Sequence, residues 1–345
     1  MDVTQEQVRE ALRQVRFPGL TRDIVSFGFV RGIAVEHGAV TVALALTTAN
    51  PEAGKEIERE ARRVLEALPG VREVRLDATV DAPQAVPPRP QLLPGVRFKV
   101  AVASGKGGVG KSTVAANLAV ALRRAGHRVG LLDADIYGPS QQMMMGCQER
   151  PRVNEAEKIL PVDGHGVAVM SLGFLMEPDT PVIWRGPMVM KALQQFLEDV
   201  EWGELDFLVV DLPPGTGDAQ LTITQLIPLD GAVIVTTPQD VALIDARKGM
   251  AMFQKVNVPV LGIIENMATF VCPHCGKESA IFKRGGGKRT AQGLDVPFLG
   301  EVPIDPAVVV GGDAGTPIVV GEPSSAAARA FVALADEVVR QVRRP

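Results

Sequence analysis

The sequence has few cysteines, no long apolar run and no basic cluster, and each absence excludes a class of protein. Three cysteines in 345 residues cannot make a disulfide framework, which favours a reducing cytoplasm. No apolar run approaches the ~20 residues of a membrane helix, and the polar, acidic start of the chain is unlike a secretory signal. The net charge of −4 gives no reason to expect nucleic acid as the main partner. We therefore expect a cytoplasmic protein that binds neither membrane nor nucleic acid.

The composition indicates a globular chain, and its prolines suggest where that chain divides. Hydrophobic residues make up 46% and charged residues 22% of the sequence, an ordinary balance for a folded protein. Residues 81–94 are rich in proline, which stiffens the backbone and excludes a packed strand. We expect a linker there, with one domain over residues 1–80 and another over residues 95–345.

The first domain has the pattern of a small α+β fold. Its segments predict the order helix, strand, strand, helix, strand, and a mostly antiparallel sheet. The expected elements are a helix over residues 5–14, strands over 24–33 and 39–46, a helix over 51–67 and a strand over 73–79.

The second domain has the pattern of an α/β fold with a mostly parallel, doubly wound sheet. Short, nearly continuous Val/Ile/Leu runs alternate with helical segments, which is typical of strands buried on both faces. These runs cover residues 98–103, 129–133, 167–171, 207–211, 232–236, 260–265 and 296–299. A final amphipathic helix over residues 324–343 is expected to pack on the sheet.

A glycine-rich loop between the first of these strands and the next helix matches the P-loop pattern G-x-x-x-x-G-K-[ST]. The loop reads Gly105-Lys106-Gly107-Gly108-Val109-Gly110-Lys111-Ser112-Thr113. Such a loop turns its N–H groups inward at a helix N-terminus, where they bind phosphate. We expect Lys111 to reach the β and γ phosphates of ATP and the Ser112 hydroxyl to coordinate Mg²⁺.

Acidic residues follow two other strands of the predicted sheet. One strand ends in Asp133-Ala134-Asp135, and another leads into the run that begins at Asp211 and reaches Asp218. Ligands of α/β sheets bind beyond the carboxyl ends of the strands, and a carboxylate there can hold the water shell of a metal ion. These acids are therefore expected to complete the nucleotide site.

Two cysteines lie on one tight segment, Cys272-Pro273-His274-Cys275-Gly276. Both thiols can face a single metal or cluster, but two ligands do not complete a four-coordinate site. A two-fold dimer would supply two from each subunit. Half of a zinc knuckle, a redox disulfide pair and an unliganded loop are the other interpretations. Cys147 is interpreted as a small buried hydrophobic residue.

The motifs together resemble a known family. With its second lysine, Lys106, the loop is similar to the deviant Walker A motif of the MinD, ParA and nitrogenase iron-protein class. The runs at residues 133–140, 184–188 and 211–218 narrow the resemblance to the Mrp/ApbC family of iron–sulfur cluster carrier ATPases, over residues 97 to about 320. The first domain, at residues 23–30, resembles the small metal–sulfur cluster assembly domain often fused ahead of that ATPase.

The resemblance implies roles for residues of the nucleotide site. Lys106 would reach across a homodimer to the partner's phosphates, and Asp135 would orient the attacking water. Asp211 would serve the Mg²⁺ ion, Asn266 would hydrogen-bond adenine, and the segment holding Asp218 would respond to the γ phosphate.

The resemblance also implies a cargo. Cys272 and Cys275 of two subunits would hold a bridging [4Fe–4S] cluster, which ATP hydrolysis would help to pass between cluster scaffolds and apo iron–sulfur clients. A MinD/ParA-like positioning ATPase, an electron-transfer ATPase and a zinc-stabilised P-loop ATPase are the alternatives.

Two segments depart from the family pattern. Residues 46–51 lack a cysteine that relatives often carry, which favours a docking role for the first domain over direct metal handling. The Gln-Gln-Met-Met-Met run at residues 141–145 replaces a proline-containing turn. Its methionines are interpreted as a pliable core patch, with a client-binding face as the alternative.

Overall fold

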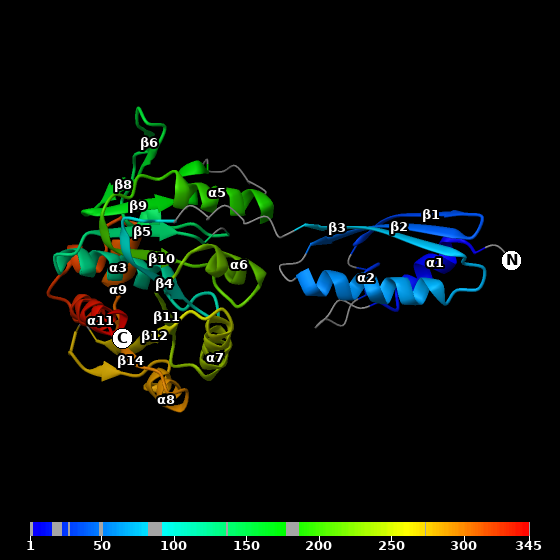
Figure 1. The fold of residues 1–345 in the computed structure, drawn as a ribbon. Helices are drawn as coiled ribbons and strands as arrows, with labels where there is room; N and C mark the ends of the chain where they lie inside the picture. Colours follow the sequence, from blue (N-terminus) through cyan, green and yellow to red (C-terminus); the bar gives the residue numbers. More distant parts are fainter. Residues whose placement is uncertain are drawn as a thin grey trace. The chain divides into compact units, whose positions relative to one another are not determined.

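The computed structural model describes residues 3–15, 23–26, 28–47, 51–81, 92–135, 137–176, 186–272 and 274–344 (Figure 1). The chain divides into two compact units, Met1–Pro90 and Gln91–Pro345. Most of the proline-rich segment, residues 82–91, lies outside the described residues, as do Trp184 and Arg185 of the run at residues 184–188.

The first unit has the predicted order of elements. These are α1 (Gln5–Leu12), β1 (Val30–Glu36), β2 (Ala39–Thr47), α2 (Pro51–Glu66) and β3 (Glu73–Asp81). β1 pairs with β2 antiparallel, but β3 pairs with β2 parallel, so the expectation of a mostly antiparallel sheet was wrong. The chain runs through α2 between the two parallel strands, and such a crossover returns it in the same direction.

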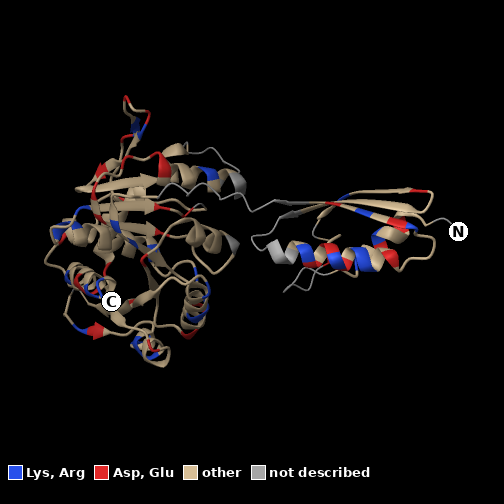
Figure 2. Cartoon of the chain, viewed as in Figure 1, with Lys and Arg blue, Asp and Glu red and all other residues tan. Residues whose placement is uncertain are grey.

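Figure 2 shows charges of both signs along α2.

The first strand of this unit begins six residues later than expected. The carboxylate of Asp23 accepts hydrogen bonds from the N–H groups of Val25, at 3.0 Å, and Ser26, at 2.8 Å, which holds a turn in place of an extended strand. Ile24 is nevertheless fully buried in the core of the unit. Its apolar side chain therefore marked the core correctly but not the secondary structure.

The second unit contains a mostly parallel sheet, as predicted, and its described residues form nine strands of that sheet. Its order is β13-β12-β11-β4-β10-β5-β9-β8, and β14 also pairs with β12. The parallel strands are β4 (Val96–Ala103), β5 (Val129–Asp133), β9 (Val167–Ser171), β10 (Leu205–Asp211), β11 (Gly231–Thr236), β12 (Val260–Val271) and β14 (Phe298–Ile304). The short strands β8 (Val162–Gly164) and β13 (Glu278–Ser279) pair antiparallel at the two ends of that order. A separate hairpin joins β6 (Arg152–Val153) to β7 (Ile159–Leu160).

Helices cover both faces of this sheet (Figure 1). Val100 and Val102 of β4 pack with α3 (Lys111–Arg124) and α11 (Ala326–Val342). Ala101 and Ala103 face the opposite core, because side chains alternate along a strand. That core contains side chains of α5 (Gly186–Glu198), α6 (Asp218–Leu226), α7 (Asp240–Lys255) and α8 (Gly286–Gly293).

The remaining helices are short. They are α4 (Gln141–Met144), the 3₁₀ helix η1 (Leu172–Leu175), α9 (Pro306–Asp313) and α10 (Ile318–Gly321). Among the helices described, none is long and apolar enough to cross a membrane.

The strand order brings the predicted acids and the P-loop to one edge of the sheet. β10 lies between β4 and β5, and Asp211 is in register with both Val102 of β4 and Asp133 of β5. Since these strands are parallel, the loops after them converge at their carboxyl ends, where α/β proteins bind ligands.

Candidate nucleotide site and cysteine hairpin

The glycine-rich loop is closely packed by its neighbours at two of its glycines. A Cβ atom on Gly105 would lie 2.0 Å from the carbonyl oxygen of Asp245 in α7. Gly110 precedes α3 with a φ of +82°, and a Cβ there would lie 2.2 Å from Nδ2 of Asn266. Only glycine fits at these positions, and the loop thereby delivers the positive end of α3 to the site.

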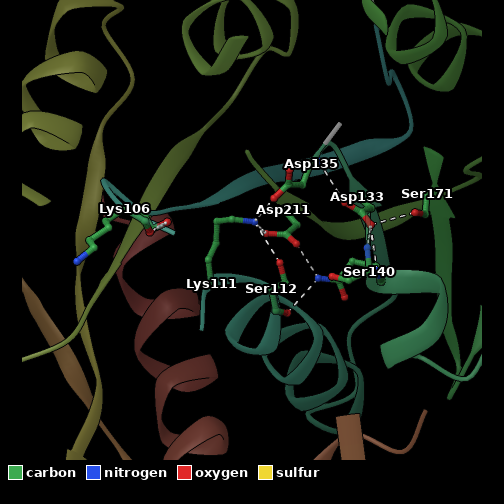
Figure 3. Close-up of polar contacts among 10 residues, drawn as sticks. Lys106, Lys111, Ser112, Asp133, Asp135, Ser140, Ser171 and Asp211 are labelled. Carbon is green, nitrogen blue, oxygen red and sulfur yellow. Dashed lines mark hydrogen bonds and ion pairs between the residues drawn. The ribbon is translucent and has the colours of Figure 1, made fainter. Parts of the chain in front are cut away.

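Lys111 is buried among carboxylates at the start of α3 (Figure 3). Its Nζ lies 2.5 Å from Oδ1 of Asp211 and 3.3 Å from Oδ2 of Asp135, and it donates to Oγ of Ser112 at 3.1 Å. Oδ1 of Asp135 is buried without a hydrogen-bond partner among the described residues. Because one cation serves two carboxylates, the residues present fit a further cation such as Mg²⁺.

Asp133 has a different environment from the other two acids. Its Oδ2 accepts hydrogen bonds from the N–H groups of Ser140, at 2.9 Å, and Gln141, at 3.0 Å, and from Oγ of Ser171 at 2.9 Å (Figure 3). Complete burial and the neighbouring charge of Asp211 raise the pKa of Asp133 to about 7, while these hydrogen bonds oppose the rise. Asp133 therefore fixes the start of α4.

The structure adds Gln141 to the residues predicted for the site. Its side chain is fully buried, and its Nε2 donates to Oδ2 of Asp211 at 2.8 Å and to the carbonyl oxygen of Ser112 at 3.0 Å. The sequence signalled this position only as a departure from the family pattern. A glutamine carries no recognisable motif for chemistry by itself, so its role was missed.

Asn266 borders an apolar cavity of about 340 Å³ beside the loop. Its Nδ2 donates to the carbonyl oxygen of Val109 at 2.9 Å, which ties β12 to the loop. The next residue, Met267, has a φ of +58° and lies where the register between β12 and β14 shifts. The cavity is otherwise lined by Gly110, Thr113, Ile281, Phe282, Val302, Pro303, Ile304, Asp305, Val308 and Val309.

Lys106 does not join the Lys111 cluster. It is exposed, and its side chain extends away from that cluster (Figure 3). Its carbonyl oxygen accepts a hydrogen bond from Oγ of Ser104 at 2.9 Å. Ile281 and Phe282, which line the apolar cavity, also line a second cavity of about 540 Å³ that includes Lys106.

The cysteine pair lies in a hairpin turn between β12 and β13. The N–H of Cys272 donates to the carbonyl oxygen of Lys277 at 3.0 Å, and that of Gly276 donates to the carbonyl oxygen of Cys272 at 2.9 Å. The N–H groups of His274 and Cys275 lower the pKa of the Cys272 thiol. The half-buried Cys272 and the exposed Cys275 thus lie on one knuckle, which these two backbone hydrogen bonds close.

Other cysteine and metal-binding side chains do not complete this knuckle within the described part of one chain. No group of three or more His, Cys, Asp or Glu residues there is arranged to hold a metal ion. Cys147 is half-buried against the core, and burial, then Asp163, raises the pKa of its thiol to about 11. The side chain of Asp218 lies outside the described residues.

A lysine-bearing glycine loop between a parallel strand and a helix, with buried acids after the neighbouring strands, defines this protein as a P-loop NTPase. Comparison with known proteins makes the assignment more specific. The profile of the NUBPL iron-transfer P-loop NTPases matches residues 95–339, and that of an iron–sulfur cluster assembly protein matches residues 5–76. The chain belongs to this iron-transfer P-loop NTPase family, and the resemblance found in the sequence is confirmed.

Individual relatives agree with the family assignment. An iron–sulfur cluster carrier protein of Synechocystis is 46% identical over 99% of this chain and 98% of its own. A nucleotide-binding protein of Archaeoglobus fulgidus, solved in complex with ADP, is 40% identical, covers 67% of this chain and 90% of its own, and superposes with a TM-score of 0.59. The cell division ATPase MinD of Pyrococcus furiosus is 27% identical over 70% of this chain and 98% of its own, with a TM-score of 0.55.

Proposed function

We propose that this protein is an ATP-binding and ATP-hydrolysing carrier, which holds a bridging [4Fe–4S] cluster as cargo in a homodimer and transfers it to apo-proteins. The observation that carries the proposal is strand β12, because it leads from Asn266 beside the P-loop directly to Cys272 and Cys275. One strand thus connects the proposed nucleotide site to the pair of thiols. The carrier named among its relatives supports the same function.

ATP would bind across the loop and the apolar cavity. Lys111 would exchange its two carboxylate partners for the β and γ phosphates, which the N–H groups of residues 105–113 would also bind. Asn266 donates to the loop through Nδ2, which leaves its Oδ1 to accept a hydrogen bond from the amino group of adenine. The volume of about 340 Å³ is within the range of small-molecule pockets.

The buried oxygen atoms beside Lys111 suit the metal and the attacking water. Ser112 and Asp211 would hold Mg²⁺, which neutralises charge on the phosphates when it is bound. Asp135, whose Oδ1 has no partner among the described residues, would accept a hydrogen bond from the attacking water and orient it. The residues within one chain thus supply these parts of the reaction.

A homodimer would complete both the nucleotide site and the cluster site. Lys106 extends away from its own phosphate site, as a lysine that reaches the partner's nucleotide would do. One knuckle offers two thiols, and a two-fold axis between two knuckles would bring four soft sulfur ligands to one cluster.

A change of the bound nucleotide would be transmitted to the cluster through the segment that follows Asn266. Ile281 and Phe282 line both cavities and lie two and three residues after the end of β13. Arg284 pairs with Glu278 of β13 and Glu301 of β14. A nucleotide that moves these side chains would therefore move the hairpin. In the cytoplasm, cluster scaffolds would pass the cluster to the hairpin, and apo iron–sulfur proteins would receive it from there. The first unit would serve as a docking module.

Anaerobic reconstitution tests the proposal. Wild-type protein is expected to contain about four iron and four sulfide ions per dimer, as four thiolates hold one [4Fe–4S] cluster. Cys272→Ser and Cys275→Ser should lose both ions, whereas Cys147→Ser, which removes a thiol elsewhere in the unit, should keep them. Zinc without sulfide would instead indicate a structural knuckle, and a full cluster in Cys275→Ser would refute the site.

A further inference from the structure

One glutamine hydrogen-bonds both of the fully buried acids of the nucleotide site. Gln141 donates its backbone N–H to Oδ2 of Asp133 at 3.0 Å and its side-chain Nε2 to Oδ2 of Asp211 at 2.8 Å. Both carboxylates are fully buried, and their charges act on each other. The residue therefore places a donor against each of two acids that would otherwise repel at close range.

The same side chain determines which oxygen of Asp211 faces Lys111. Nε2 of Gln141 hydrogen-bonds Oδ2 of Asp211, so that Oδ1 of Asp211 is the atom directed at Nζ of Lys111, 2.5 Å away. A second hydrogen bond, from Nε2 to the carbonyl oxygen of Ser112, ties this arrangement to the first turn of α3. Gln141 thus contacts both residues that would serve Mg²⁺.

The other end of the amide is available for a ligand. Oε1 of Gln141 is buried and has no hydrogen-bond partner among the described residues. A buried acceptor without a donor is costly in a folded protein. Gln141 contacts Asp211, which shares Lys111 with Asp135, and Oδ1 of Asp135 is likewise buried without a partner among the described residues. A water molecule bound to a metal ion is a donor that would satisfy Oε1 of Gln141.

We infer that Gln141 is a positioning residue for the magnesium ion: it orients Asp211 through Nε2 and accepts a hydrogen bond from a metal-bound water through Oε1. This inference rests on the proposed nucleotide site. Residues that orient metal ligands in this way typically change metal affinity by 10–100-fold when they are replaced. The structure supplies a matched control, since the adjacent Gln142 lies in the same helix and hydrogen-bonds Ser171 and Pro139.

The test is to measure ADP affinity by calorimetry with Mg²⁺ and with EDTA, and Mn²⁺ affinity of the ADP complex by electron paramagnetic resonance. In Gln141→Met, which keeps the length of the side chain, we expect Mn²⁺ affinity to fall about tenfold and ADP affinity in EDTA to change less than about twofold. Gln142→Met should match the wild type in both. Gln141→Leu serves as a second apolar variant if the first does not fold.

The outcomes separate the inference from the function on which it rests. Unchanged Mn²⁺ affinity in a folded Gln141 variant would overturn the inference, as would an equal loss in EDTA, which would indicate general damage to the loop. A similar loss in Gln142→Met would overturn it too. Wild-type protein that binds no ADP would refute the proposed function, and this inference with it.

Discussion

Replacement of Lys111 by methionine tests how the site is held together without nucleotide. The ammonium group lies against two buried carboxylates, those of Asp211 and Asp135. Lys111→Met keeps most of the apolar stem but leaves both carboxylates without their cation. Breaking a buried ion pair from one side typically costs about 3–5 kcal/mol. For a unit of this size, each kcal/mol lowers the melting temperature by about 2–4 °C, so we expect a decrease of roughly 6–20 °C.

Differential scanning calorimetry without nucleotide at neutral pH measures this loss. Lys106→Met is the matched control, because it removes an exposed lysine from the same loop and should change the free energy of unfolding by less than about 0.5 kcal/mol. Adding Asp211→Asn to Lys111→Met should recover part of the stability, since it removes the carboxylate closest to the lost cation. A Lys111→Met protein that melts with the wild type would refute the reasoning, as would a double variant less stable than the single one.

Other predictions concern hydrolysis, domain organisation and pH. Asp135→Asn should bind ATP within about threefold of the wild type but hydrolyse it about 100-fold more slowly, measured by phosphate release and calorimetry; normal turnover with weak binding would contradict its role. A chain lacking residues 1–90 should still melt cooperatively, because the second unit has its own core, and aggregation would contradict this. Burial and Asp211 raise the pKa of Asp133 from 3.8 to about 7. Between these two pH values Asp133 keeps a proton in the folded protein that it has released in the unfolded chain. The free energy of unfolding should therefore fall as the pH rises from about 4 to about 7, by at most about 4 kcal/mol, and Asp133→Asn should flatten that part of a urea-unfolding series.

The central sheet was predictable because its strands are buried on both faces. A strand such as β11, buried along its whole length, reads as a continuous apolar run and has few alternative structures. The short edge strands β8 and β13 left no such pattern, because two or three residues do not establish a period. In the first unit, the hydrogen bonds of Asp23 hold a turn, so β1 begins later than the apolar run after Asp23 predicted.

The site was predictable where a residue belongs to a motif and unpredictable where only the fold brings residues together. The spacing of Lys111 within its loop predicted a lysine at the start of a helix for binding phosphates, and the pattern of strands placed Asp211 on the same edge. Gln141 lies 70 residues from Asp211 in the sequence, and only the pairing of β5 with β10 brings the two together. The opposite directions of Lys106 and Lys111 likewise depend on the turn of the loop.

The continuity of β12 has a consequence for how cargo can leave the proposed dimer. Asn266 lies on β12 and Cys272 directly follows its last residue, Val271, so these two residues are separated by at most about 20 Å of backbone. In a symmetric dimer two such strands would be related by the same two-fold axis that passes through the cluster. When both subunits change nucleotide state together, both pairs of thiolates would shift by equal amounts on opposite sides. Release would then be concerted, with four iron–sulfur bonds weakened at once.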